Sequence, residues 1–417
     1  MVNFALIDCN NFFVSCERIF RPDLETKPVA VLSNNDGCII ARSDEVKQLG
    51  IPMGQPLFKC KDIIQKHNVT LFSSNFALYG DISTRVMNIL DQFSPNIEVY
   101  SIDEAFIKIP IQEELYTFGS MLQNTVKQWT GIPTRIGIGK TKTLAKAGSY
   151  FAKKTQSPVF NTNDYSLPLL LKDMPITEVW GIGRKTSKKL IQNGITTAYQ
   201  FTELPEQYIK KTLSVTGLRT QLELKGMPCI KLEEQISSRK SILSSRSFGK
   251  KLSHLYDLKS ALANNVCTAA EKCRKQKLLA KTLQVFIKTS HIRNQYYSKS
   301  IIVNLPQASN SSFELITYAL SALEKIYIPE QSYAKSGILL LGLCNENEYQ
   351  KSLFTSPQLP NHKTKPIMTT LDQLNKKWGK RCINPAIINW NKQAWKMNQN
   401  QRSPRYTTVW KEIPIVS

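Results

Sequence analysis

Residues 100–106, Tyr-Ser-Ile-Asp-Glu-Ala-Phe, place two acidic side chains, Asp103 and Glu104, inside a run that is apolar on both sides. The stretches 97–101 and 105–109 have the composition of two short strands, so the acids lie at the turn of a hairpin. An ordinary polar turn can contain such a pair of acids as well. The apolar setting favours a functional role.

The segments around this hairpin follow the order β-α-β-β-α-β. A strand over 2–7 ends at Asp8, helical apolar spacing covers 79–93, and a helix over 113–129 and a strand over 134–138 follow the hairpin. This order is typical of the split βαβ arrangement, in which the first strand lies beside the hairpin. We therefore expect Asp8 to approach Asp103 and Glu104.

Three converging carboxylates repel one another strongly unless a cation lies among them. Carboxylate oxygens are hard ligands of the kind that Mg²⁺ prefers. The sequence therefore predicts a magnesium site made by Asp8, Asp103 and Glu104.

The charge of the chain indicates a polyanionic partner. Among 417 residues, 55 Lys and Arg stand against 32 Asp and Glu, a net charge of +23, and the hydrophobic content of 41% excludes wholesale disorder. The N-terminal residues lack the pattern of a signal peptide, and no apolar run approaches the ~20 residues of a membrane span. We expect a cytoplasmic protein without membrane contact, whose nine scattered cysteines are reduced.

Two further segments carry features of DNA binding. Around residues 174–195, a Gly-Ile-Gly turn at Gly181 and Gly183, followed by Lys185, resembles a helix-hairpin-helix, whose exposed backbone N–H groups bind a phosphate. A plain helix hairpin with glycine caps is the alternative. Residues 240–342 repeat the β-α-β-β-α-β order without the acids and hold 15 Lys and Arg against 5 Asp and Glu. This net charge of +10 predicts phosphate binding.

Several stretches together resemble the UmuC type of the Y-family of translesion DNA polymerases, over essentially the whole chain. They are residues 8–17, 31–38, 100–106, 141–146, 179–183, 245–249, 286–290 and the Ser-Pro-Arg-Tyr-Thr-Thr run at 403–408. The resemblance implies a multidomain α+β fold shaped as a right hand. Its parts are a ferredoxin-like palm (1–12 and 80–168), fingers (13–79), a helical thumb with the helix-hairpin-helix (169–239), a βαββαβ little finger (240–342) and a C-terminal tail with docking segments (343–417).

The resemblance also implies the reaction, an error-prone, template-directed nucleotidyl transfer past damaged bases in the SOS response. Two Mg²⁺ ions are then held by Asp8, Asp103, Glu104 and the Cys9 carbonyl, with Asp103 and Glu104 catalytic. Primer-template DNA and a deoxynucleoside triphosphate are the substrates. The implied nucleotide contacts are Phe12, Phe13, Lys47 and Lys153, with Phe13 as the steric gate against ribonucleotides.

The implied DNA contacts of the little finger are Arg246, Lys250 and Lys288. A clamp-binding pentapeptide is implied at residues 350–354, through Gln350, Leu353 and Phe354, although Lys351 replaces the leucine usual in this family. The further implied partners are a processed UmuD-like dimer and a recombinase filament, and the protein would associate with the nucleoid during repair.

Two other functions use the same residues. A two-metal nuclease needs the same carboxylates, and a non-catalytic DNA-binding repair subunit needs only the basic surfaces. The aromatic pair Phe12-Phe13 close to Asp8 and an insertion able to cover a nucleotide favour the polymerase.

Overall fold

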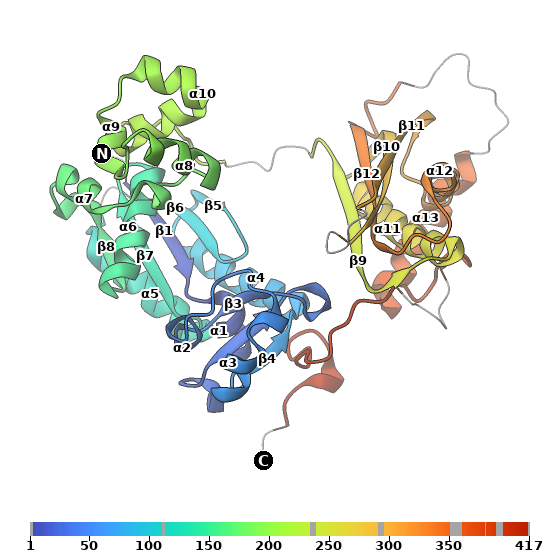
Figure 1. Ribbon diagram of the computed structural model, residues 1–417, viewed down its shortest axis with the longest axis horizontal. Helices are drawn as coiled ribbons and strands as arrows, with labels where there is room; N and C mark the ends of the chain where they lie inside the picture. Colours follow the sequence, from blue (N-terminus) through green and yellow to red (C-terminus); the bar gives the residue numbers. More distant parts are fainter. Residues whose placement is uncertain are drawn as a thin grey trace. The chain divides into compact units, whose positions relative to one another are not determined.

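The computed structural model describes residues 3–110, 113–233, 239–290, 296–350, 361–379, 381–388 and 395–415. Internal contacts divide the chain into two compact units, residues 1–236 with 400–417, and residues 237–399. Each unit has its own β-sheet structure (Figure 1). None of the helices in the described ranges combines the length and apolar character that crossing a membrane requires. All nine cysteines are free thiols, as the sequence predicts.

The first unit is built on a five-stranded sheet in the order β5-β6-β1-β7-β8. Its strands are β1 (Asn3–Cys9), β5 (Ile97–Val99), β6 (Glu104–Ile109), β7 (Thr134–Gly139) and β8 (Val159–Asn161). β1 is central and antiparallel to both β6 and β7. The predicted split βαβ order is confirmed, and the parallel edge strand β8 is an addition that the apolar pattern did not indicate.

Alternate residues of β1 face two layers of helices. Ala5 and Ile7 belong to the core formed with α4 (Phe76–Phe93) and α5 (Leu115–Thr130). Phe4 and Leu6 lie on the other face, in a cluster with Ala145 of α6 (Lys142–Thr155). Because both faces are covered, the strand is apolar at consecutive positions and shows no alternation.

Glycines allow α6 to lie very close to β7. A Cβ atom at Gly137 would be 2.1 Å from the backbone nitrogen of Ser149 and 2.2 Å from the carbonyl oxygen of Ala145. Gly148 faces Gly137 from the helix, where a Cβ would lie 3.0 Å from the Gly137 Cα. This contact fixes the helix that carries the basic side chains next to the acids.

The inserted module between β1 and α4 has a three-stranded sheet in the order β3-β2-β4. Its elements are α1 (Phe12–Ile19), β2 (Val29–Leu32), β3 (Ile39–Arg42), α2 (Asp44–Gln48), α3 (Lys61–Lys66) and β4 (Thr70–Ser73). β2 pairs antiparallel with β3 and parallel with β4.

A helical part follows β8 and shares an apolar cluster with α6 and β8. It contains α7 (Leu167–Asp173), α8 (Arg184–Gln192), α9 (Ala198–Thr202) and α10 (Glu206–Leu224). Short 3₁₀ helices lie at Pro22–Leu24, Asn34–Asp36, Leu57–Lys59, Thr162–Asp164, Ile176–Glu178 and Trp410–Glu412.

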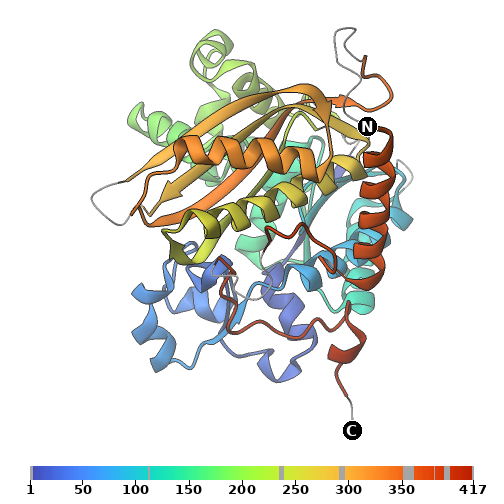
Figure 2. The ribbon, with the colours of Figure 1, turned by 90° about the vertical axis from the view of Figure 1, so that its right-hand side faces the viewer.

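The second unit has a four-stranded antiparallel sheet in the order β11-β10-β12-β9. Its elements are β9 (Ile242–Leu252), α11 (Leu255–Lys275), β10 (Leu278–Thr289), β11 (Ser298–Ser309), α12 (Ser312–Ile326) and β12 (Tyr333–Asn345). α11 and α12 lie side by side on one face of the sheet (Figure 2). The element order is the predicted one, but the first strand is at an edge here, whereas β1 is central in the first unit.

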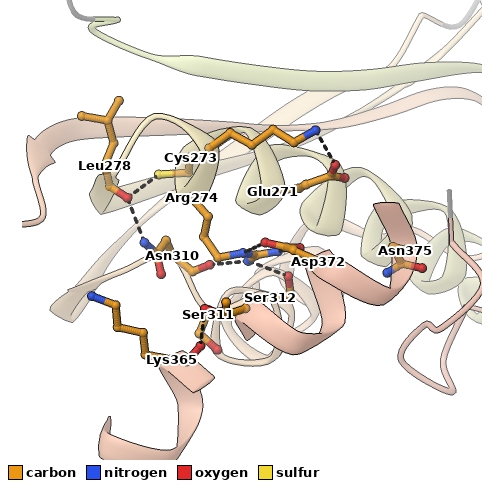
Figure 3. Close-up of polar contacts among 12 residues, drawn as sticks. Glu271, Cys273, Arg274, Leu278, Asn310, Ser311, Ser312, Lys365, Asp372 and Asn375 are labelled. Carbon is orange, nitrogen blue, oxygen red and sulfur yellow. Dashed lines mark hydrogen bonds and ion pairs between the residues drawn. The ribbon is translucent and has the colours of Figure 1, made fainter. Parts of the chain in front are cut away.

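Part of the segment expected to be an extended tail is helical. α13 (Asn361–Trp378) is tied to α11 by Arg274, whose Nε and Nη2 donate to the two carboxylate oxygens of Asp372 at 2.7 and 2.8 Å (Figure 3). Arg274 Nη1 also donates to the Asn310 carbonyl at 2.7 Å. This docking could not be predicted from the sequence, because the partner of Asp372 lies 98 residues earlier in the chain.

Candidate active site

The backbone brings the three predicted acids together. Asp8 at the end of β1 lies opposite Glu104 in the antiparallel register with β6. The next residue, Cys9, donates its backbone N–H to the Asp103 carbonyl at 2.9 Å. The predicted approach of Asp8 to the hairpin turn is therefore confirmed.

Each of the three side chains also has a partner outside the group. Asp8 pairs with Lys153 at 2.5 Å, Glu104 pairs with Lys146 at 2.7 Å, and Asp103 accepts a hydrogen bond from the Ser101 hydroxyl. Within the described ranges, no three His, Cys, Asp or Glu side chains are gathered closely enough to hold a metal ion. Asp8 and Glu104 meet at the strand end, as expected, and the metal site itself stays a prediction.

The electrostatics of this strand end still fit a cation. Burial raises the pKa of Glu104, and the negative charge of Asp8 raises it further, while Lys146 acts against both. The pKa of the buried Cys9 thiol is raised by burial and then by the charges of Asp8, Asp103 and Glu104, so all three acids surround this residue. Three carboxylates and a backbone carbonyl are a suitable oxygen donor set for Mg²⁺.

A basic cavity of about 570 Å³ is lined in part by Asp8. Its walls include Lys47, Arg135 and Lys153, so the structure brings both predicted lysines to one cavity. Lys47 Nζ donates to the side-chain oxygens of Asn11 and Asp44, each at 2.7 Å. Arg135 was missed by the sequence analysis, although its place on the strand paired with β1 puts it opposite Asp8.

The two aromatic residues at the start of α1 differ in burial. Phe12 is 3% exposed and belongs to the core of the unit, so its predicted nucleotide contact finds no support in its position. Phe13 is only partly buried. Its ring stacks on Tyr79 with centroids 4.5 Å apart and meets the edge of Phe76 at 6.0 Å. The Phe13 ring also packs against the core cluster that contains Phe12, with the two ring centroids 6.0 Å apart.

The Gly-Ile-Gly turn lies between a 3₁₀ helix and α8. Gly181 and Gly183 are exposed, and Ile182 between them is buried, so the turn presents its backbone outward. Gly181 has φ +88°, and Gly183 is the N-cap of α8. Lys185 is exposed in the first turn of that helix. This geometry suits a phosphate at a helix N-terminus.

The predicted DNA contacts of the second unit lie on different sides. Lys250 is exposed, and Lys288 lies over the Phe286 ring at 5.7 Å. Arg246 instead stacks on Trp395 at 5.3 Å, and Trp395 is hydrogen bonded to Ser260 of α11. Arg246 therefore faces the helix layer, and burial and the charge of Arg381 lower its pKa. Gln350 is exposed, whereas Leu353 and Phe354 lie outside the described residues.

Comparison with known proteins follows the same division of the chain. The model of the impB/mucB/samB family matches residues 7–150, and that of the family's C-terminal domain matches residues 239–353. The IMS family HHH motif matches residues 166–195, and a domain of unknown function (DUF4113) matches residues 365–416.

Relatives cover nearly the full chain. Protein UmuC of Salmonella typhimurium is 39% identical over 98% of this chain and 99% of its own length, and Protein ImpB of the same organism is 38% identical over 99% of both. DNA polymerase IV of Bacillus anthracis is 27% identical over 89% of this chain and 90% of its own length.

Solved structures share the fold. A Y-family DNA polymerase chimera of Dbh and Dpo4 superposes with a TM-score of 0.66 at 17% identity, covering 83% of this chain and all of its own. Given the identity to UmuC and ImpB over almost the whole length, the chain belongs to the impB/mucB/samB family, the UmuC type of Y-family DNA polymerases.

Proposed function

We propose that this protein, an error-prone translesion DNA polymerase, transfers nucleotides at the strand end formed by Asp8, Asp103 and Glu104. The observation that supports this site most directly is the register that sets Asp8 opposite Glu104, with Asp103 hydrogen bonded to the adjacent Cys9. Acidic oxygens and a basic cavity thus lie next to each other. A reaction between a hydroxyl and a triphosphate requires the two reacting groups to be held close together in this way.

We assign the metal site to Asp8, Asp103, Glu104 and the Cys9 carbonyl, with two Mg²⁺ as the occupants. Bound there, the ions would lower the pKa of the primer 3′-hydroxyl and stabilise the leaving pyrophosphate. Lys47, Arg135 and Lys153 bind the triphosphate, and Lys153 exchanges its ion pair with Asp8 for one with a phosphate. Phe13 packs against the sugar and excludes a 2′-hydroxyl.

The alternatives are less well supported. A two-metal nuclease does not require an aromatic side chain such as Phe13 on the helix that follows the acidic strand end. A non-catalytic DNA-binding subunit does not require three intact acids at one strand end. The relatives with printed activities are DNA polymerases.

Replacing Asp103 by Asn tests the assignment. The variant should lose nucleotide incorporation and keep nearly unchanged DNA binding, because it removes charge at the metal site and leaves the basic surfaces intact. Asp91→Asn, an exposed position on α4, is the matched control. Retention of more than about a tenth of the wild-type rate, which is ~1.4 kcal/mol of barrier, would contradict the assignment.

We further propose three protein partners: a sliding clamp bound through Gln350, Leu353 and Phe354, a processed UmuD-like dimer, and a recombinase filament. An apolar dipeptide within a polar stretch supports the clamp contact. The double variant Leu353→Ala/Phe354→Ala should lose stimulation by the clamp and keep basal synthesis on short primers. Unaltered stimulation would rule this contact out. Activity in the SOS response and association with the nucleoid belong to the same proposal.

A further inference from the structure

The Ser-Pro-Arg-Tyr-Thr-Thr run follows the second unit in sequence but packs on the first. Ser73 at the end of β4 donates its backbone N–H to the Gln401 carbonyl, and the Gln401 N–H donates to the Ser73 hydroxyl, both at 3.0 Å. Tyr406 stacks on Phe20 at the end of α1, with centroids 4.4 Å apart and planes 15° apart.

Asn75, the N-cap of α4, holds the centre of this segment. Its Nδ2 lies 3.2 Å from the Ser403 carbonyl, 3.0 Å from the Ser403 hydroxyl and 3.1 Å from the Pro404 carbonyl. Ser403 is only 5% exposed. The segment is therefore anchored on both α1 and α4, the helices that carry Phe13 and its stacking partner Tyr79.

Glu17 lies between the segment and those aromatic rings. It is 1% exposed, and its Oε1 accepts a hydrogen bond from the Tyr79 hydroxyl at 2.6 Å. Its other oxygen is buried and has no hydrogen-bond partner among the described residues. The Ser403 hydroxyl reaches α4 through Asn75, which bonds to it by Nδ2 at 3.0 Å and whose carbonyl accepts the backbone N–H of Tyr79 at 3.1 Å. Burial raises the Glu17 pKa, and the Tyr79 and Ser403 hydroxyls act against this by favouring the charged form.

Tyr79 transmits this contact to the ring of Phe13. Its side chain is fully buried, its hydroxyl is fixed by Glu17, and its ring supports Phe13 at 4.5 Å with an interplanar angle of 15°. Phe13 and Glu17 are four residues apart on α1 and so lie on one face of the helix. The contacts thus run from Ser403 through Asn75 and Tyr79 to Phe13, and Glu17 fixes the Tyr79 hydroxyl.

We propose that the C-terminal segment 400–409 is a positioning element of the sugar site, in which Ser403, acting through Asn75 and Tyr79, holds the Phe13 ring in place. Ser403 does not touch the substrate. The proposal rests on the function given above, since it requires Phe13 to meet the sugar of the incoming nucleotide.

Three substitutions in the full-length protein test the proposal. Ser403→Ala removes the hydroxyl, Ser403→Thr keeps it, and Tyr79→Phe keeps the stacked ring and loses the bond to Glu17. Thr408→Ala is the matched control, because it removes an exposed hydroxyl from the same segment. Ribonucleotide and deoxyribonucleotide incorporation are measured on one primed template, with kcat and KM separated for each.

Ser403→Ala and Tyr79→Phe should raise the ratio of ribonucleotide to deoxyribonucleotide kcat/KM about fivefold, the effect of losing one ordinary hydrogen bond. The change should lie mainly in KM for the ribonucleotide. Ser403→Thr should restore the wild-type ratio, and Thr408→Ala should not change it.

Phe13→Ala separates failure of the inference from failure of the function. If Phe13→Ala raises the ratio while Ser403→Ala and Tyr79→Phe leave it unchanged, the segment has no positioning role and the polymerase assignment stands. The same conclusion follows if Ser403→Ala lowers thermal stability and both incorporation rates equally. An unchanged ratio in Phe13→Ala, or no incorporation by the wild type, would overturn the sugar site itself.

Discussion

At the scale of single residues, the first unit contains a buried ion pair outside the predicted site. Lys142 is 2% exposed, and its Nζ lies 2.8 and 2.7 Å from the two carboxylate oxygens of Glu98. Glu98 also accepts the backbone N–H of Glu233 at 2.7 Å, and the ammonium lies 4.7 Å from the centre of the Phe106 ring. Each charge therefore has its partners, so the pair contributes to stability only while both members are present.

Replacing Lys142 by Met should cost about 3–5 kcal/mol of the free energy of unfolding, because it leaves the Glu98 carboxylate buried without its counterion. Urea unfolding measures this loss. The double variant Lys142→Met/Glu98→Gln should regain a large part of it. A loss below about 1 kcal/mol in the single variant would show that water reaches Glu98.

A second residue-scale prediction concerns the pH dependence of stability. Because burial raises the pKa of Glu17, the folded state binds the proton more tightly than the unfolded chain. The free energy of unfolding of the wild type should therefore fall as the pH rises from the ordinary carboxyl pKa to the raised pKa of Glu17. At higher pH the free energy of unfolding should stay at this lower value. Glu17→Gln should remove this part of the pH dependence.

Thermal unfolding of the wild type and Glu17→Gln should be compared at several pH values from about 4, the ordinary carboxyl pKa, to about 9. Glu25→Gln, an exposed site, is the control and should follow the wild type. A Glu17→Gln curve parallel to the wild-type curve would contradict the prediction.

At the scale of elements, the contact between α6 and β7 decides where the basic side chains lie. Lys146 and Lys153 are seven residues apart on α6, close to two turns, so both project toward the acids from one face. The glycines at the contact set the distance between helix and sheet. A shift of α6 would separate both lysines from Asp8 and Glu104 at once.

Gly137→Ala should destabilise the first unit by more than about 3 kcal/mol, because its Cβ would clash with the backbone of α6 and not with a flexible side chain. Gly80→Ala is the matched control. Gly80 lies inside α4 with no atom within 4 Å of an added Cβ, so alanine should raise stability by about 0.5–1 kcal/mol. Equal effects of the two substitutions would exclude a close helix–sheet contact.

At the scale of the whole molecule, the net charge of +23 implies binding to DNA that weakens steeply with salt. We expect the second unit to contribute through the sheet face that α11 and α12 leave uncovered. Lys288 lies in β10, beside the partly buried Phe286 of the same strand. Lys275, by contrast, is on α11 and is already paired with Glu271 at 2.9 Å.

Lys288→Ala should weaken DNA binding uniformly across sequences and reduce the slope of log K against log salt by about 1, the loss of one phosphate contact. Titrations of a labelled primer-template at several salt concentrations give the slope. Lys275→Ala removes a charge of the same sign from the helix side and should leave the slope unchanged. A reduced slope for Lys275→Ala and not for Lys288→Ala would place the DNA on the helix side.

The sequence by itself determined the order of elements and the position of the acids. Apolar periodicity is local, so the strand ending at Asp8 and the hairpin at Asp103 and Glu104 could be predicted from short windows. The split βαβ order then set β1 beside the hairpin, and the register confirms it. The same reasoning gave the element order of the second unit.

Only the tertiary structure decided what depends on distant partners. The pairing of Asp8 with Lys153 joins residues 145 positions apart, and the bond from Asn75 to Ser403 spans 328 positions. The edge position of β9 and the turn of Arg246 toward Trp395 also depend on the path of the whole chain. Local periodicity tells which face of an element is apolar, but not which remote segment will cover that face, and so the link from the C-terminal segment to Phe13 is visible only in the folded protein.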